Sequence, residues 1–176
     1  MTAAGTSILH GARVIDFTGT VSEFRQMPGC SDEFTDLVRH GEAPKAVVIV
    51  DHSLNAKHRG PVLVRDHLNL TGSSPLLGPN HPAGDRFPVV QGIYVDDVLP
   101  ELPRVVAAGL KPGVRPTADD MELILRYGGE ACCYNVVPAM LLAAHAKRRV
   151  LAILVPEGTA LPDSIARELH AMTGGK

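Results

Sequence analysis

Short, continuous apolar runs separated by turn-forming residues dominate the hydrophobic pattern of this chain. A strand that is apolar on both faces needs cover on both faces, so such runs are typical of a buried sheet flanked by helices. The pattern therefore predicts an α/β fold. The expected strands lie at residues 12–17, 46–50, 61–64, 92–95, 105–108, 131–134 and 150–155.

Helical patterns occupy several of the intervals between these strands, and we expect helices at residues 32–39, 118–127, 138–147 and 162–172. Thr117 stands three residues before Asp120, the spacing of a capping box that satisfies free amides in a first helical turn. The last helix has an apolar face suited to packing on a sheet, made by Leu161, Ile165, Leu169 and Met172.

Length and composition indicate one soluble domain spanning residues 1–176. Hydrophobic residues make up 45% and charged residues 20% of the chain, which is ordinary for a globular protein. The formal net charge of -2 gives no basic surface, so nucleic acid is not an expected partner. The basic triplet at 147–149 is interpreted as the solvated end of a helix. The longest apolar run, 136–146, is too short to span a bilayer, so we expect a cytoplasmic protein without a membrane partner.

Three cysteines, Cys30, Cys132 and Cys133, form an odd set without a C-x-x-C spacing. This set fits neither a disulfide framework nor a zinc site, so free thiols are expected. The histidines show no H-x-x-x-H spacing, and no metal or other cofactor is expected.

The most distinctive segment, residues 65–88, reads RDHLNLTGSSPLLGPNHPAGDRFP. One interpretation is a surface loop punctuated by Gly and Pro. However, a loop of about 20 residues without structure of its own is uncommon, and is usually functional or interfacial. The ordered string resembles the purine nucleoside phosphorylases, in which a strand ending in Arg-Asp-His leads through Pro-Leu-x-Gly-Pro-Asn to Gly-Asp-Arg-Phe-Pro. The matching residues are Arg65, Asp66, His67, Asn69, Leu70, Pro75, Leu76, Gly78, Pro79, Asn80, Gly84, Asp85, Arg86, Phe87 and Pro88.

This resemblance implies a three-layer phosphorylase-like α/β fold, with a central mixed sheet flanked by helices. Residues 117–155 also resemble that family's helix, strand, Val-Pro-initiated helix and final sheet strand in order. In the family the long loop packs between subunits, and its Phe reaches the neighbour's nucleoside pocket. By resemblance, Phe87 would serve a neighbouring subunit, and the chain would form a homo-oligomer through the 65–88 loop, most simply a trimer.

The resemblance also implies that the phosphate contacts have changed. The matching region begins well inside the domain of that family. The chain is therefore expected to be a shortened, divergent form without the family's N-terminal Gly/Ser phosphate loop. The family's Gly-Arg-x-His-x-Tyr segment aligns with residues 19–24, where Thr20, Ser22, Glu23 and Phe24 stand. Its phosphate-binding Ser aligns with Asn135.

The base-recognition residues of the family are replaced as well. Its purine-binding Glu and Asn fall near Pro116 and Gly158, whose side chains supply no such hydrogen bonds; Glu122 or Glu130 is an alternative for the Glu. Ordinary purine phosphorolysis is therefore not expected. The replacements make the pocket less polar, which suits a neutral or hydrophobic ligand.

Polar residues nevertheless follow the expected strands at their carboxyl ends, where open α/β sheets bind ligands. Asp51 and His52 follow one strand, Tyr134 and Asn135 end another, and Glu157 follows the last. Because an imidazole can take up or release a proton near neutral pH, His52 is a candidate general acid or base, assisted by Asp51 or Glu157 if either is within hydrogen-bond reach. Tyr134 is a candidate proton donor. Asp51 is equally an ordinary turn residue.

The candidate substrate-binding set comprises Asn135, Phe87, Thr20, Ser22, Glu23, Phe24 and Cys133. Asn135 at the start of a helix would stabilise developing negative charge together with the helix amides, or serve as an ordinary N-cap. Cys133 would need a partner such as His52 to become nucleophilic, and one of the two adjacent cysteines is expected in the core.

Three functions remain open. The leading hypothesis is an enzyme repurposed from the phosphorylase fold, one that binds a small, rather apolar molecule and catalyses isomerisation, cyclisation, elimination or hydrolysis without phosphate. Such chemistry suits specialised metabolism. The second is a genuine purine nucleoside phosphorylase or nucleosidase whose phosphate contacts come from other residues. The third is a non-catalytic binding or assembly protein.

Overall fold

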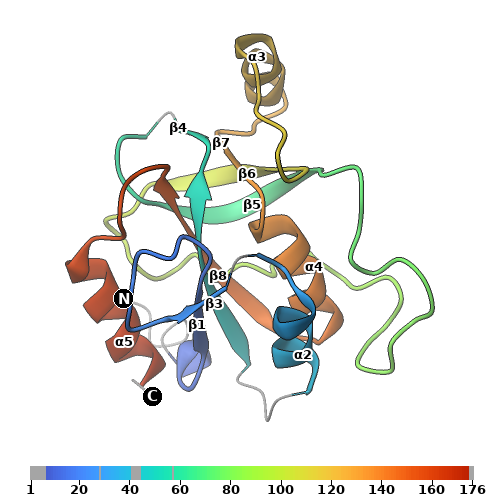
Figure 1. Ribbon diagram of the computed structural model, residues 1–176. Coiled ribbons are helices and arrows are strands. Elements are labelled where there is room, and N and C mark those ends of the chain that lie inside the picture. The colour runs from blue at the N-terminus through green and yellow to red at the C-terminus, as the bar shows by residue number, and fades with distance from the viewer. Residues whose placement is uncertain (1–6, 28, 41–44, 57, 175–176) are drawn as a thin grey trace.

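The computed structural model describes residues 7–27, 29–40, 45–56 and 58–174, and within them a single eight-stranded mixed sheet organises the fold (Figure 1). The order of its strands is β2-β1-β3-β8-β5-β6-β7-β4. The strands are β1 (Arg13–Asp16), β2 (Arg25–Gln26), β3 (Ala46–Ser53), β4 (Asn55–Ala56), β5 (Val62–Leu70), β6 (Arg104–Leu110), β7 (Ala131–Cys133) and β8 (Arg149–Pro156). The helices are α2 (Asp32–His40), α3 (Ala118–Arg126), α4 (Val136–His145) and α5 (Asp163–Thr173).

The sheet is mixed because β5 runs antiparallel to its neighbour β8. Strands β1, β3 and β8 pair in parallel, whereas β5 pairs with β8 antiparallel only at Val62 and Leu63. It then bends away at a register shift between Val64 and Asp66, and continues in parallel with β6. Such an irregularity bends a strand and lets it leave one neighbour for another.

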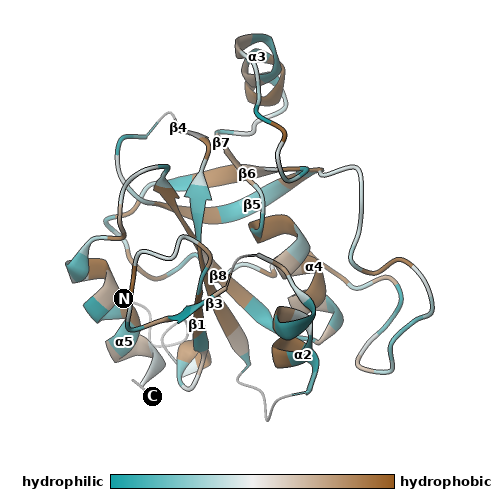
Figure 2. Cartoon of the chain, in the orientation of Figure 1, coloured by the Kyte–Doolittle hydropathy of each residue, from teal (hydrophilic) through white to brown (hydrophobic). Residues whose placement is uncertain are grey.

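Helices cover both faces of the sheet, as the continuous apolar strands predict. In Figure 1, α5 lies on one side of β3 and β8, and α2 and α4 lie on the other. Figure 2 shows hydrophobic residues along much of β3 and β8. Alternate residues of β3 enter two cores: Val47 and Ile49 pack with α2 and α4, while Val48 and Val50 pack with α5. The predicted three-layer α/β arrangement, with a central mixed sheet flanked by helices, is thus confirmed.

Most predicted elements are present, with shifted ends. Thr117 and Asp120 form the expected capping box: the Asp120 N–H donates to Thr117 Oγ1 at 3.2 Å, and the Thr117 N–H donates to Asp120 Oδ2 at 2.8 Å. The four residues of the apolar face predicted for the last helix are all buried. Helix α4 begins at Val136, two residues before the predicted start, and the backbone leaves it at Lys147, where φ is 58°.

One predicted strand, 92–95, is not a strand. It forms only an isolated parallel bridge between Tyr94 and Val150, near the start of β8, whereas β5 pairs with β8 further along, at Ile153 and Leu154. Two short strands, β2 and β4, were not predicted, since each has only two residues. No helix in the described part of the chain is long and apolar enough to cross a membrane.

The basic triplet does not form a solvated helix end. Lys147 is exposed, but Arg148 retains only 7% of its accessible surface. Arg149 donates hydrogen bonds from Nε to the Ile93 carbonyl at 3.1 Å and from Nη2 to the Tyr94 carbonyl at 2.6 Å. Both arginines are therefore packed into the structure: Arg149 holds segment 93–94 against β8, and Arg148 reaches the Leu37 carbonyl of α2.

Candidate functional site

The carboxyl ends of β3, β7 and β8 bring several of the predicted site residues together. In the register of β3 and β8, His52 lies opposite Val155, and the Glu157 N–H donates to the Ser53 carbonyl at 3.1 Å. Hydrogen bonds between Asp51 and Asn135 join the end of β3 to the turn between β7 and α4. The predicted convergence at this edge of the sheet therefore exists, although the side chains are not arranged as a catalytic group.

Asp51 and Asn135 form a closed hydrogen-bonded unit. The Asn135 N–H donates to Asp51 Oδ2 at 2.8 Å, and the Asn135 amide Nδ2 donates to Asp51 Oδ1 at 3.0 Å. Asp51 is only 3% exposed, and burial raises the pKa of its carboxyl, although the bonds from Asn135 oppose that rise. The Asn135 side chain makes no capping bond to α4. Its amide is committed to Asp51, which fixes the first turn of α4.

His52 points away from this unit. Side chains alternate along a strand, so Asp51 shares the α2–α4 face of β3 with Ile49, and His52 shares the α5 face with Val50. Asp51 accepts only the backbone N–H of His52, at 2.9 Å. Among the described residues, no hydrogen bond or ion pair joins the His52 ring to Asp51 or Glu157, and its buried Nδ1 has no partner. The expected carboxylate–imidazole pair is not formed.

Glu157 and Tyr134 both bind the loop that connects β6 to α3. Arg115 donates two hydrogen bonds to the Glu157 carboxylate, at 2.6 and 2.5 Å, and this pairing lowers the pKa of Glu157. The Tyr134 hydroxyl donates to the Val114 carbonyl at 3.0 Å. The sequence contains no signal for Arg115, because it lies in an exposed loop 42 residues before its partner. Glu157 and Tyr134, two of the proposed catalytic residues, are thus hydrogen-bonded to residues 114–115 of this loop.

The turn after β1 places most of the next candidates at the surface. Asp16 is fully buried and accepts hydrogen bonds from the backbone N–H groups of Thr18 and Val21, each at 2.9 Å. This arrangement leaves three of the candidates exposed, Thr20, Ser22 and Glu23. Phe24 is 7% exposed and belongs to the core beneath α5, so its side chain serves packing.

The cysteines have the properties of core residues. Cys133 is fully buried, and burial is the main cause that raises its pKa well above the ordinary value. It shares the α2–α4 core, on the face of the sheet opposite His52. A thiol in this position stays protonated, which argues against nucleophilic catalysis. All three cysteines are free, as predicted, and no cluster of His, Cys, Asp or Glu within the described ranges could hold a metal ion.

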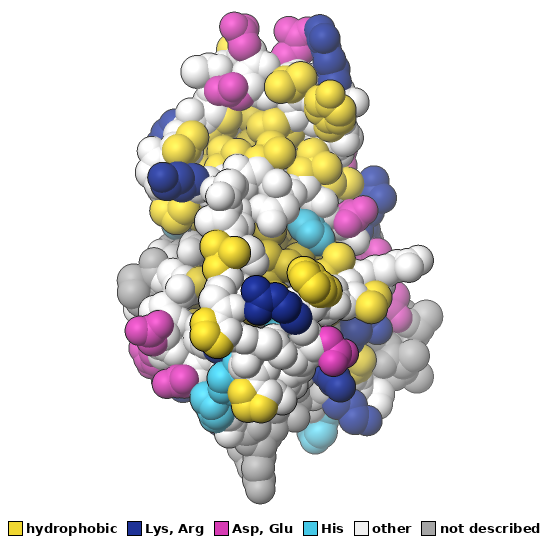
Figure 3. Space-filling model, turned by 90° about the vertical axis from the view of Figure 1, so that its right-hand side faces the viewer, with side chains coloured by type: hydrophobic (Ala, Val, Ile, Leu, Met, Phe, Trp, Pro, Cys, Tyr) yellow, Lys and Arg dark blue, Asp and Glu magenta, His cyan; other side chains and the backbone are white. Residues whose placement is uncertain are grey.

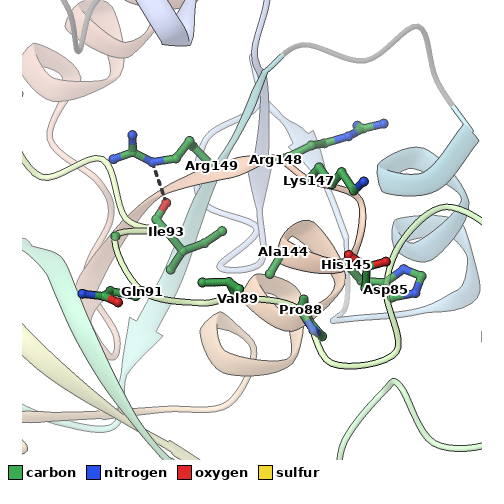
Figure 4. Close-up of a pocket in the computed structure, with 11 residues that line it drawn as sticks. Asp85, Pro88, Val89, Gln91, Ile93, Ala144, His145, Lys147, Arg148 and Arg149 are labelled. Carbon is green, nitrogen blue, oxygen red and sulfur yellow. Dashed lines mark hydrogen bonds between the residues drawn. The ribbon is translucent and has the colours of Figure 1, made fainter.

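A cavity of about 330 Å³ lies elsewhere, between residues 85–93 and the turn from α4 to β8 (Figure 4). It is lined by Arg149, the first residue of β8, whereas Glu157 follows the last residue of that strand. Cavity and candidate site are therefore at opposite ends of β8. Sequence reasoning did not find this cavity, because the basic triplet beside it was interpreted as solvated.

Comparison with known proteins defines the class to which this fold belongs. No protein-family model matches the chain. Two solved structures of purine nucleoside phosphorylases share its fold. One, in complex with ribose-1-phosphate, has a TM-score of 0.67 and 18% identity over 94% of this chain and 87% of that one. The other, from schistosoma with hypoxanthine, has a TM-score of 0.66 and 18% identity over 89% and 79%.

Two curated relatives extend the likeness to sequence. Purine nucleoside phosphorylase 1 of Bacillus subtilis (strain 168) is 30% identical over 105 residues, covering 52% of this chain and 38% of that protein. Its namesake in Geobacillus stearothermophilus is 32% identical over 105 residues, with the same two coverages, 52% and 38%. The match thus spans about 38% of the length of these relatives. The chain is purine nucleoside phosphorylase-like in both sequence and fold.

Proposed function

We propose that this chain binds a small, rather apolar organic molecule at the carboxyl ends of β3, β7 and β8, and catalyses acid-base chemistry there without phosphate. Solved proteins of the same fold were crystallised with hypoxanthine and with ribose-1-phosphate, which supports a small-molecule role for the fold. Isomerisation, cyclisation, elimination and hydrolysis are the reaction types that the available side chains suit.

The observation that carries this proposal is the uncommitted imidazole of His52. Within the described part of the chain its Nδ1 is buried without a hydrogen-bond partner, and the residue as a whole is partly exposed at the end of β3. A buried ring nitrogen is normally satisfied by protein or by ordered solvent. A histidine at the mouth of an α/β sheet whose ring is not tied to another side chain is available to exchange protons with a ligand.

The other polar groups have supporting roles in the proposed mechanism. The Asp51–Asn135 unit positions the first turn of α4, whose free amides favour developing negative charge. Glu157 and Tyr134 hold the loop at Val114 and Arg115 against the candidate site. We propose that either side chain reaches a ligand only after that loop releases it.

A phosphate-dependence assay tests this function. With inosine as substrate, we expect no release of hypoxanthine, with or without inorganic phosphate. Phosphate-dependent release would instead make the protein a genuine phosphorylase. Once a neutral ligand has been found by screening, His52→Asn should abolish its turnover, while His170→Asn, an exposed histidine on α5, should leave turnover intact. Full activity of His52→Asn would refute the assigned role.

We further propose that the chain forms a homo-oligomer, most simply a trimer, through the 65–88 loop. The segment after β5 exposes large hydrophobic side chains: Leu77 keeps 76%, Phe87 85% and Val89 81% of their accessible surface. Figure 3 shows hydrophobic side chains gathered on the face that this loop occupies. Exposed apolar side chains of this size favour burial against a protein partner. In the proposed assembly, Phe87 lies at the neighbour's candidate site.

A further inference from the structure

The cavity beside the basic triplet has an apolar floor and a cationic rim. Its apolar lining comes from Pro88, Val89 and Ile93 of one segment and from Ala144 of α4; Ile93 and Ala144 are buried, whereas Val89 keeps 81% of its accessible surface. Three cations border it: Lys147, Arg148 and Arg149. In Figure 4, Lys147 and Arg148 extend to one side of the cavity and Arg149 to the other, with Val89 and Ile93 between them.

These cations have no counter-anion in the described part of the chain. The five ion pairs found there involve Arg25, His40, His67, Arg115 and Arg126, and none involves Lys147, Arg148 or Arg149. One carboxylate, Asp85, also lines the cavity. His145 lies beside it, and its pKa is lowered, chiefly because the ring is buried. The rim therefore keeps an excess of positive charge in a chain whose net charge is -2.

Arg148 makes this excess unusual, because it is a buried cation. It is 7% exposed, and among the described residues its side chain makes one hydrogen bond, from Nη1 to the Leu37 carbonyl, which is long at 3.5 Å. Arg13, another cation, acts on it electrostatically. A buried charge is normally paired with an opposite charge, because leaving water without such a partner is unfavourable. The carbonyl at the end of α2 supplies only part of that compensation.

We propose that this cavity binds a small organic anion, with its carboxylate or phosphate group beside Lys147 and Arg148 and its apolar body over Val89, Ile93 and Ala144. The volume of about 330 Å³ is within the range of small-molecule sites. A wholly polar anion would leave the apolar floor uncovered, and a neutral molecule would leave the cations unpaired. The ligand therefore needs both parts.

Calorimetric titration at low ionic strength tests the ligand class on the full chain. We expect benzoate or phenyl phosphate to bind, and whichever binds tighter identifies the preferred anionic group. Benzyl alcohol has the same ring without the charge, and inorganic phosphate has the charge without the ring; each should bind at least about tenfold more weakly. Equal binding of benzyl alcohol, or no binding of either organic anion, would overturn the proposal.

Backbone amide shifts locate the bound anion. On addition of benzoate we expect the amide resonances of Ile93 and Ala144 to shift. The amide resonances of Asn135 and His52, at the other end of β8, should stay unchanged. Shifts confined to Asn135 and His52 would overturn the cavity assignment and bear instead on the proposed acid-base site. The two proposals can therefore fail separately.

Two substitutions with opposite expected effects test the rim. Lys147→Gln removes an exposed cation and should weaken benzoate binding about three- to tenfold, whereas Asp85→Asn removes the repelling carboxylate and should tighten it about two- to fivefold. Arg126→Gln, which removes an exposed cation on α3, is the matched control and should change nothing. Unchanged benzoate affinity in both rim variants would refute the site. This test does not require the buried Arg148 to be replaced, so it holds even if Arg148→Gln fails to fold.

Discussion

Asp51 holds Asn135 by two hydrogen bonds, one to the backbone N–H at 2.8 Å and one to the side-chain amide at 3.0 Å. This contact joins β3 to the start of α4 across 84 residues of sequence. The contact occupies the Asp51 carboxylate, and we propose that Asp51 positions the first turn of α4 at the candidate site.

Asp51→Ala should therefore destabilise the protein. The substitution leaves two donors of Asn135 without their acceptor in a partly buried place, and we expect a loss of about 2–4 kcal/mol in the free energy of unfolding. Urea denaturation measures the loss. Asp36→Ala, which removes an exposed carboxylate of α2, is the control and should have little effect. Equal stability of the two variants would show that the Asp51–Asn135 contact contributes nothing.

The thiols should react slowly in the folded protein. Burial raises the pKa of Cys132 from 9.0 to about 11, and also raises the pKa values of Cys30 and Cys133. A higher pKa means less thiolate below it, so at pH 8 alkylation of Cys132 should be roughly a hundredfold slower than that of an ordinary thiol. Mass spectrometry after iodoacetamide treatment measures this rate. Ser22→Cys, at an exposed turn, provides a fast-reacting reference. Rapid modification of the folded wild type would contradict the burial.

Gly84 should not accept a side chain. A Cβ at this position would lie 1.7 Å from the His145 carbonyl oxygen, which is backbone and cannot rotate away. Gly84→Ala should displace the loop from α4 and cost about 1–3 kcal/mol of stability, as overpacking does. Thermal unfolding measures the cost. At Gly60 an added Cβ meets no atom of the described residues within 4 Å, so Gly60→Ala is the matched control. A neutral Gly84→Ala would mean that the loop does not pack closely on α4.

Arg115 and Glu157 should control the mobility of the loop before α3. Both side chains are exposed, so we expect little change in global stability when either is replaced. Arg115→Gln or Glu157→Gln should nevertheless speed amide hydrogen exchange in the segment around Val114, and the exchanged pair Arg115→Glu with Glu157→Arg should restore protection. Exchange unaffected by either single substitution would indicate that Tyr134 alone holds this loop.

Phe87 should contribute to assembly and not to the stability of the subunit. Because 85% of its surface is exposed, Phe87→Asp should leave unfolding of the isolated chain unchanged while shifting sedimentation toward monomer. Leu125→Asp, an exposed apolar residue of α3, is the control and should not alter the assembly. A wild type that sediments as a monomer at all concentrations would contradict the proposed oligomer directly.

The sequence by itself determined the features that neighbouring residues encode. Continuous apolar runs predicted a sheet covered on both faces, and the capping pair Thr117 and Asp120 and the apolar face of the last helix are confirmed. The ordered string at 65–88 was enough to identify a phosphorylase-like fold, which the solved structures of that class confirm. Periodicity, capping and signature strings are local, so they can be read without knowing which segments pair in space.

Only the tertiary structure decided where the chemistry lies. Strand β3 continues to Ser53, beyond the predicted end at residue 50, and its alternation therefore sends Asp51 and His52 to opposite faces of the sheet. The pairing of Arg115 with Glu157 and the burial of Arg148 depend on segments far apart in the chain. Side-chain direction follows from register and bond formation between distant strands, and local residue patterns do not specify these contacts.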